Sequence, residues 1–182
     1  TYIMEGKSYY LKPWDILLVS HNRIHRPLID TSEPYERIVL WMNTDFLKYH
    51  STNEHSLSDC FRVAEQRNFS LLRPGADERL EIMKLLSGIE DASRSIEFGH
   101  DLLARTYFLQ FMIKLNRLSE ADDTQTDTTA YRSDPKIEEI TAYINEHLAE
   151  DLSLDFLSRT FYISKSHLMH RFKSATGCTT HN

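Results

Sequence analysis

The spacing of apolar side chains changes partway along the chain, and this change constrains the fold more than any other feature of the sequence. Before residue 43, branched and aromatic residues form two short apolar runs at 16–19 and 38–42, separated by polar segments that contain proline. Runs of this length are typical of strands buried on both faces. From about Ala76 the apolar residues recur every three or four positions, which is the period of a helix. We therefore predict an α+β fold in which a small antiparallel sheet or barrel precedes a set of helices.

Two long helices are predicted after residue 76. The first carries one apolar stripe, made of Ile82, Leu85, Leu86 and Ile89. The second has apolar residues on two faces: Leu102, Leu109 and Ile113 on one, and Phe108, Phe111, Leu115 and Leu118 on the other. Both faces are expected to be covered, because exposed apolar area is costly in water. The face that contains Phe108 either packs within its own domain or forms the interface of a homodimer.

A polar segment divides the chain into two predicted domains. Residues 119–134 contain almost no apolar side chains, so they cannot bury enough surface to order themselves. As a flexible coil this linker would span about 20–25 Å and would let the domains move independently. Residues 1–118 are predicted to form the first domain and residues 135–182 the second.

Three short helices are predicted in the second domain. Asp134 and Pro135 are a strong helix start, because Asp caps a helix and Pro is tolerated at its first position. A second helix follows Ser153, and Ser164 after the turn at 162–163 caps a third, which Gly177 ends. The inward positions of these helices predict one small shared core; they are Ile137, Ile140, Ile144, Leu148, Leu154, Leu157, Phe161, Leu168 and Phe172.

Charge is unevenly distributed between the predicted domains. The chain as a whole carries −6, but residues 156–182 contain no Asp or Glu and carry +4 from Arg159, Lys165, Arg171 and Lys173, so residues 1–155 carry −10. The outward residues of the third helix are therefore cationic, polar or apolar and never acidic. A helix of this kind is suited to the major groove of DNA, with cations beside the phosphates. The alternative is an ordinary solvated amphipathic helix, which would normally mix both signs of charge.

The same segment carries a recognisable motif. Residues 137–177 read IEEITAYINEHLAEDLSLDFLSRTFYISKSHLMHRFKSATG, and this stretch resembles the first helix-turn-helix of AraC-type transcription regulators. The positions that fall on the family pattern are Leu152, Ser153, Leu154, Leu157, Phe161, Ile163, Ser164, Ser166, Leu168, Phe172, Lys173 and Gly177. His170 stands at the family's usual basic position, and the arginine follows at Arg171.

The resemblance implies a role for each exposed position of the third helix. Ser166, Met169 and His170 would face bases, and Lys165, Arg171 and Lys173 would contact phosphates. Members of the family carry a second helix-turn-helix, and this chain stops where the connecting helix would begin. We therefore interpret the chain as a fragment that is truncated at both ends, with its first strands also missing.

The N-terminal region resembles the sensor domain of the same family. Residues 9–25, YYLKPWDILLVSHNRIH, resemble a cupin segment, although Trp14 and Ser20 replace its usual Gly and Pro. The resemblance implies a partial cupin-like antiparallel barrel that binds a small effector. A sugar-like ligand would suit a pocket lined by His25, Tyr35, Arg37 and Trp41, because their donors and aromatic faces match hydroxyls and ring C–H groups.

No metal or other cofactor is expected. In metal-binding cupins the position of His25 supplies one ligand, but the companion His-x-His and Glu are not present in this sequence. Cys60 and Cys178 are far apart and lack metal-ligand spacing, so both are expected to be reduced thiols.

These observations predict a cytoplasmic, dimeric, ligand-responsive DNA-binding regulator, with carbohydrate metabolism as one field of action. No apolar run is long enough to span a membrane, and residues 1–30 lack a secretory signal. The predicted partners are double-stranded DNA, a small effector and a second copy of the chain, and no enzyme activity is expected. The alternatives are a cupin-fold enzyme and a dimerisation module that does not bind DNA.

Overall fold

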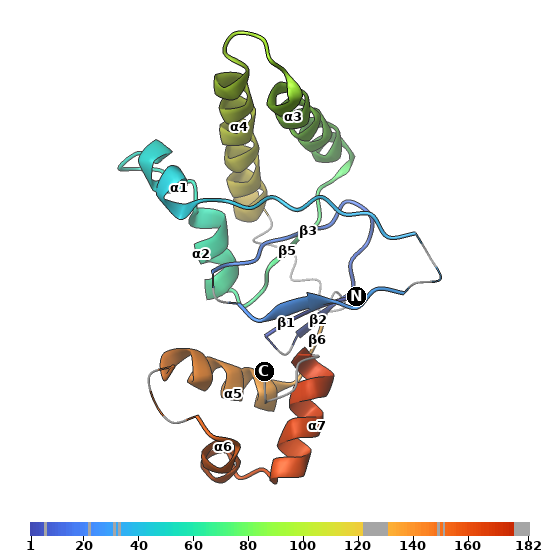
Figure 1. Ribbon diagram of the computed structural model, residues 1–182, viewed down its shortest axis with the longest axis vertical. Coiled ribbons are helices and arrows are strands. Elements are labelled where there is room, and N and C mark those ends of the chain that lie inside the picture. The colour runs from blue at the N-terminus through green and yellow to red at the C-terminus, as the bar shows by residue number, and fades with distance from the viewer. Residues whose placement is uncertain are drawn as a thin grey trace. The chain divides into compact units, whose positions relative to one another are not determined.

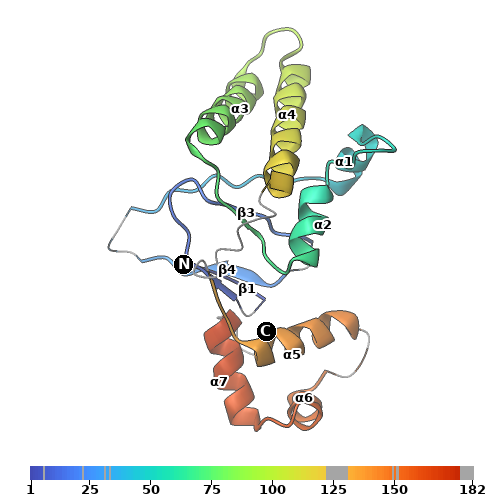
Figure 2. The same cartoon turned by 180° about the vertical axis from the view of Figure 1, so that it is seen from behind.

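The chain has an α+β fold with seven helices and two small antiparallel sheets, within the residues that the structure describes. The structure is a computed structural model and describes residues 1–5, 7–21, 23–30, 32, 34–121, 131–148, 150 and 152–176, with only the backbone at 131–133 and 176. It comprises two compact units (Figures 1 and 2). Unit 1 is formed by residues 1–11, 21–37 and 127–182, and unit 2 by residues 12–20 and 38–126.

A four-stranded antiparallel sheet forms one half of unit 1. Its strands, in spatial order, are β4 (His25–Pro27), β1 (Tyr2–Met4), β2 (Lys7–Tyr9) and β6 (Tyr131–Ser133). Ile3, Met4 and Tyr9 are buried. Glu5 turns the chain between β1 and β2 with a φ of 51°, and its carboxylate accepts a hydrogen bond from the Ile24 N–H at 2.8 Å.

Three helices form the other half of unit 1, as the sequence predicts. They are α5 (Pro135–Glu146), α6 (Leu154–Thr160) and α7 (Lys165–Thr176). Asp134 caps α5 and Pro135 follows it, which confirms the predicted helix start. The shared core is confirmed too, and it consists of Ile137, Ile140, Leu157, Phe161, Ile163, Leu168, Phe172 and Ala175, with Ile144 and Leu154 partly buried against it. Leu148 is 64% exposed, so that predicted core position is wrong.

Unit 2 is dominated by a helical hairpin. Its elements are β3 (Ile16–Leu17), α1 (Thr44–His50), α2 (Asp59–Gln66), β5 (Leu71–Leu72), α3 (Ala76–Arg94) and α4 (His100–Ala121). Helices α3 and α4 run side by side (Figures 1 and 2). They approach closely at Gly88, where a Cβ atom would lie 2.8 Å from the ring of Tyr107. A larger residue at this position would therefore force the Tyr107 ring to move.

The predicted buried strand at 38–42 is wrong, and of the predicted sheet or barrel the described residues show small sheets. The described strands form two small sheets and no closed barrel. Only Ile16 and Leu17 of the first apolar run are in a strand, paired with Leu72 and Leu71. Residues 38–42 form no strand, and Ile38 and Trp41 are 69% and 90% exposed. Closure of a sheet needs each strand to find a neighbour on both sides, and this run has no paired neighbour among the described residues.

The predicted linker also differs at both ends. Helix α4 continues through residues 119–121, where Ser119 is buried, and Tyr131–Ser133 form strand β6 beside β2. Residues 122–130 and the predicted helix end at Gly177 lie outside the described residues. Backbone hydrogen bonding explains the strand, because pairing with β2 requires no apolar side chains. Consequently α5–α7 form one compact unit with N-terminal strands, a grouping that composition did not indicate.

Candidate nucleic-acid interface

Helix α7 has one buried face and one exposed face. Leu168, Phe172 and Ala175 are buried in the core with α5 and α6. The exposed residues are Lys165, Ser166, His167, Met169, His170, Lys173 and Ser174, and none of them is acidic. Because α7 ends next to strands β1 and β2 with its C-terminal turn (Figures 1 and 2), its N-terminal half projects away from the sheet.

The turn before α7 fixes where this helix begins. The Ile163 N–H donates to the Ser158 carbonyl at 3.0 Å, and the Ser158 hydroxyl donates to the Ile163 carbonyl at 2.7 Å. Tyr162 adopts a φ of 52° in this turn, which is the left-handed region. The Ser164 hydroxyl then accepts a hydrogen bond from the His167 N–H at 3.3 Å, so it caps α7 as predicted.

Two of the predicted phosphate contacts already have acidic partners within unit 1. Lys165 forms an ion pair with Asp155 of α6, and both side chains are more than half exposed. Arg171 forms a two-point pair with Asp134, in which the Arg171 Nε donates to Oδ2 at 2.9 Å and Nη2 donates to Oδ1. Lys173 is the predicted phosphate contact for which the described side chains provide no ion pair within 4.0 Å.

Asp134 combines two tasks at the start of α5. Its Oδ1 accepts hydrogen bonds from the N–H groups of Lys136 and Ile137 at 3.2 and 3.3 Å, while both of its oxygens accept from Arg171. Partial burial is the largest influence on its pKa and acts upward. The hydrogen bonds from Arg171 and from the two backbone groups, together with the charge of Arg171, outweigh burial and lower the pKa of Asp134 below its usual value.

Two exposed residues near this face were missed by the sequence prediction. Arg159 is exposed in the last turn of α6, and Tyr162 is 97% exposed in the turn. The signal for Arg159 was present, because it belongs to the acid-free segment that begins at residue 156. No signal marked Tyr162, since aromatic residues in turns are equally compatible with burial.

Three of the four predicted effector residues lie around one side chain that the sequence did not single out. His25 stacks on the Tyr2 ring with centroids 6.0 Å apart, and the Arg37 guanidinium lies close enough to Tyr2 to influence the pKa of its phenol. Burial is the main cause that raises the pKa of Tyr2; the nearby Tyr35 also raises it, while Arg37 lowers it. His25, Tyr35 and Arg37 are all exposed. Trp41 belongs to unit 2 and is 90% exposed.

The predicted dimer face of α4 is instead part of the unit 2 core. Phe111 and Leu115 are 4% and 1% exposed, and Phe108 and Leu118 pack against the same core. The other apolar face of α4 points outward, because Leu102 and Ile113 are 60% and 42% exposed. Of the two alternatives for this face, the one with Phe108, the structure shows packing within its own domain, and buried side chains offer no surface to a second copy.

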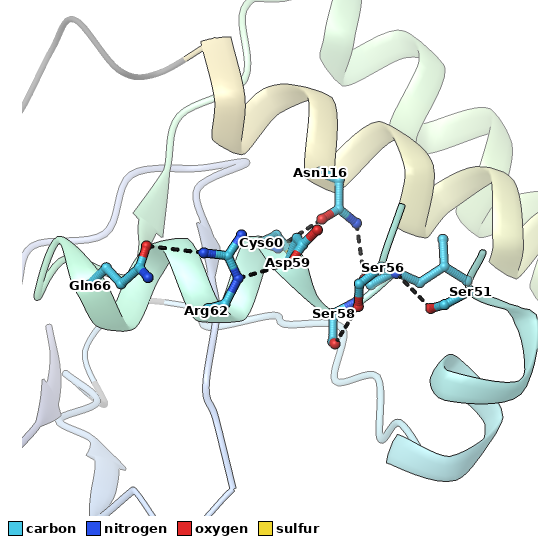
Figure 3. Close-up of polar contacts among 9 residues, drawn as sticks. Ser51, Ser56, Ser58, Asp59, Cys60, Arg62, Gln66 and Asn116 are labelled. Atoms are coloured by element: carbon cyan, nitrogen blue, oxygen red, sulfur yellow. Dashed lines mark hydrogen bonds and ion pairs between the residues drawn. The ribbon is translucent and has the colours of Figure 1, made fainter. Parts of the chain in front are cut away.

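A polar side chain on α4 accounts for the burial of the face that contains Phe111 and Leu115. Asn116 accepts a hydrogen bond from the Cys60 N–H at 2.7 Å and donates to the Leu57 carbonyl at 2.9 Å (Figure 3). The Ser58 side chain makes no cap hydrogen bond to α2, so Asn116 satisfies this helix start from another element. Because Cys60 is buried beside it, the pKa of this thiol is raised to about 12.

The described residues contain no group of three or more His, Cys, Asp or Glu side chains that could hold a metal ion. Among the described helices, none has the length and apolar character needed to cross a bilayer. Comparisons of the chain with models of known protein families, with curated proteins and with solved structures gave no match.

Proposed function

We propose that this chain belongs to a DNA-binding transcription regulator of the AraC type, in which α7 enters the major groove, and that it is not an enzyme. The observation that carries the proposal is the exposed face of α7, which combines Lys165, His170 and Lys173 with small or neutral side chains and has no acidic residue. Base edges in the major groove present acceptors that such donors can reach, and phosphates attract the cations. The buried face of α7 supports the same reading, because α5 and α6 hold it as a rigid element.

The arrangement of α6 and α7 also supports this function. A short helix, a turn capped by Ser164 and a second helix with an exposed N-terminal half form the elements of a helix-turn-helix. Arg159 lies exposed on α6, which in this class of motif crosses the phosphate backbone. Such a regulator would act where DNA is found, in the cytoplasm of a bacterial cell.

Titration of the full chain against duplex DNA at several salt concentrations tests the proposal. Each cation that contacts a phosphate contributes about 0.9 to the slope of log affinity against log salt. Lys173→Ala is therefore expected to reduce the slope by about one. Lys84→Ala is the matched control, because Lys84 is an exposed lysine on α3 of unit 2 and its removal should leave the slope unchanged. Absence of salt-dependent binding by the unaltered chain would rule the function out.

We further propose that a homodimer forms through the outward face of α4. Leu102, Thr106, Leu109 and Ile113 follow one another at spacings of four, three and four residues. This order reads the same in both directions, so two antiparallel copies of the stripe would place Leu102 of each against Ile113 of the other. Self-complementarity of this kind is what a twofold symmetric interface requires, and Leu102 and Ile113 are exposed in the single chain.

Sedimentation of the double variant Leu102→Asp, Ile113→Asp tests this interface. Two charges placed in an apolar seam should convert the dimer to a monomer, because burying unpaired carboxylates is costly. Leu80→Asp is the matched control, since Leu80 is 55% exposed on α3 and lies outside the stripe. A chain that sediments as a monomer before any substitution would contradict the proposed dimer.

The surface around Tyr2 is our proposal for effector binding. A phenol, an imidazole and a guanidinium at this place provide donors and aromatic faces for a hydroxyl-rich ligand such as a sugar. A ligand that binds only the folded chain raises its melting temperature. We therefore expect a hit from a panel of sugars, lost in Arg37→Ala and retained in Arg105→Ala. A shift that persists in Arg37→Ala would remove this surface from consideration.

A further inference from the structure

We propose that Arg171 is a positioning residue, which holds the reading helix α7 against the start of α5 through Asp134, and that it does not contact phosphate. This inference rests on the proposed DNA-binding function. It replaces the role that the motif resemblance implied for Arg171, and it names Asp134 as a second residue on which sequence reading depends.

The geometry of the pair is that of a fixed link. The guanidinium donates from two nitrogens to two carboxylate oxygens, an arrangement that restricts orientation as well as distance. Asp134 is itself tied to the first turn of α5 by two backbone hydrogen bonds. The Asp134 carboxylate thus connects the beginning of one helix to the second turn of another.

The second ion pair of α7 provides a contrast. Lys165 meets Asp155 through a single ammonium group, and their side chains are 51% and 57% exposed. The side chains of Arg171 and Asp134 are only 33% and 25% exposed. Exposed single-point pairs contribute little and exchange readily with solvent ions. A phosphate can therefore replace Asp155 beside Lys165 more easily than it can replace Asp134 beside Arg171.

The position of Arg171 makes the link relevant to base reading. It directly follows His170 and comes two residues after Met169, both of which are proposed to face bases. It also precedes Phe172, which is anchored in the core. A rotation or shift of α7 after loss of the link would misplace Met169 and His170 while leaving the number of cations on the exposed face unchanged.

A competing interpretation of the ion pair predicts the opposite change in DNA affinity when the Asp134 charge is removed. If Asp134 merely withheld Arg171 from a phosphate, removal of the Asp134 charge would release the arginine and strengthen DNA binding. If the pair positions α7, the same change weakens sequence-specific binding. Asp134→Asn suits the test because asparagine is as good a helix N-cap as aspartate, so the start of α5 is preserved.

The experiment uses the full chain and two duplexes of equal length: one selected by the unaltered chain from a random-sequence pool, and one of mixed sequence. For Asp134→Asn and Arg171→Lys we expect about a tenfold loss of affinity for the selected duplex, which is equivalent to one lost base contact. Affinity for the mixed duplex and the salt slope on both duplexes should stay as in the unaltered chain. Arg171→Lys is informative because it keeps the charge and loses the two-point geometry.

Two controls on the exposed face calibrate these results. Lys173→Met should weaken binding to both duplexes alike and reduce the slope of log affinity against log salt by about one. Asp155→Asn should strengthen binding to both duplexes, because it releases Lys165.

Tighter binding by Asp134→Asn, or unchanged binding by Arg171→Lys, would overturn the inference while the proposed function stands. Failure of the unaltered chain to bind either duplex would overturn both. Circular dichroism melting establishes that each variant is folded, and either of Asp134→Asn and Arg171→Lys carries the test if the other is not.

Discussion

Helices α4 and α7 each bury one face, but only the faces of α7 were predicted from the sequence. In α7 the inward residues are apolar and the outward ones are charged or polar, so the two faces differ in kind. In α4 both faces are apolar, and the structure buries the one with Phe111 and Leu115 while Leu102 and Ile113 remain exposed. Periodicity identifies the faces of a helix, but charge is needed to decide which of them points inward.

The largest expected effect is the difference in unfolding free energy between substitutions on the buried face and on the exposed face of each helix. Leu115→Ala in α4 and Leu168→Ala in α7 should each lower the free energy of unfolding by about 3 kcal/mol, because both leucines are fully buried and the mutation leaves a cavity. The outward changes Leu102→Ala and Met169→Ala should stay within about 0.5 kcal/mol. Urea unfolding at low protein concentration provides the measurement, since dilution removes any contribution from a dimer. A large cost for Leu102→Ala under these conditions would reverse the assignment of faces in α4.

A smaller effect is expected at the polar residue that orients α4. Asn116→Ala leaves the Cys60 N–H and the Leu57 carbonyl without their partner, and a buried unsatisfied group costs about 1–3 kcal/mol. We expect Asn116→Ala to lower the free energy of unfolding by about 2 kcal/mol. Gln110→Ala is the control, because Gln110 is an exposed residue of the same helix, and it should leave the free energy of unfolding unchanged. If Asn116→Ala were as stable as the unaltered chain, the hydrogen bonds to α2 could not be the reason for the orientation of α4.

The elements that the sequence predicted correctly depend on local chemistry. Asp134 and Pro135 start α5, and Ser164 caps α7, because capping needs only residues within one turn. The shared core of α5–α7 followed from their apolar spacing. By contrast, the fate of residues 38–42 depended on whether distant strands would pair with them, and the position of β6 beside β2 involves residues more than 120 positions apart. Local composition predicts neither the lack of a partner strand for residues 38–42 nor the pairing of β6 with β2.

The candidate site shows the same division. The exposed set Lys165, Ser166, Met169, His170 and Lys173 could be predicted, because helical period and the lack of acidic residues are both visible in the sequence. The partners of Lys165 and Arg171 could not, since Asp155 and Asp134 approach them only after the helices have packed. The position of Tyr2 beside His25 and Arg37 could not be predicted for the same reason.

The dependence of stability on pH also compares the two helices, because each contributes one residue to an ion pair with a carboxylate. The pKa of Asp134 beside Arg171 and that of Glu81, which Lys114 of α4 contacts, are both lowered in the folded chain. A carboxyl whose folded pKa is depressed stabilises the fold above its unfolded pKa of about 4 and loses that contribution as pH falls through the folded value. As the pH falls below about 4, the melting temperature of the unaltered chain should therefore drop more than that of Asp134→Asn. The difference should be smaller for Glu81→Gln, because the Glu81 side chain is 59% exposed. Equal acid sensitivity of Asp134→Asn and the unaltered chain would contradict the link described for Arg171.

The smallest effect is expected at the exposed pair Asp101 and Arg105 in the first turns of α4. Their charged atoms are 3.8 Å apart and both side chains are more than half exposed, so Arg105→Ala should change the free energy of unfolding by no more than about 0.5 kcal/mol. This pair adjoins the proposed dimer stripe, however, because Arg105 directly precedes Thr106. If unfolding measured at high protein concentration shows a cost above about 1 kcal/mol that disappears on dilution, Arg105 takes part in the contact between copies. A cost that is independent of concentration would mean that the apolar outward face of α4 is covered within a single chain, and the contrast with α7 would no longer hold.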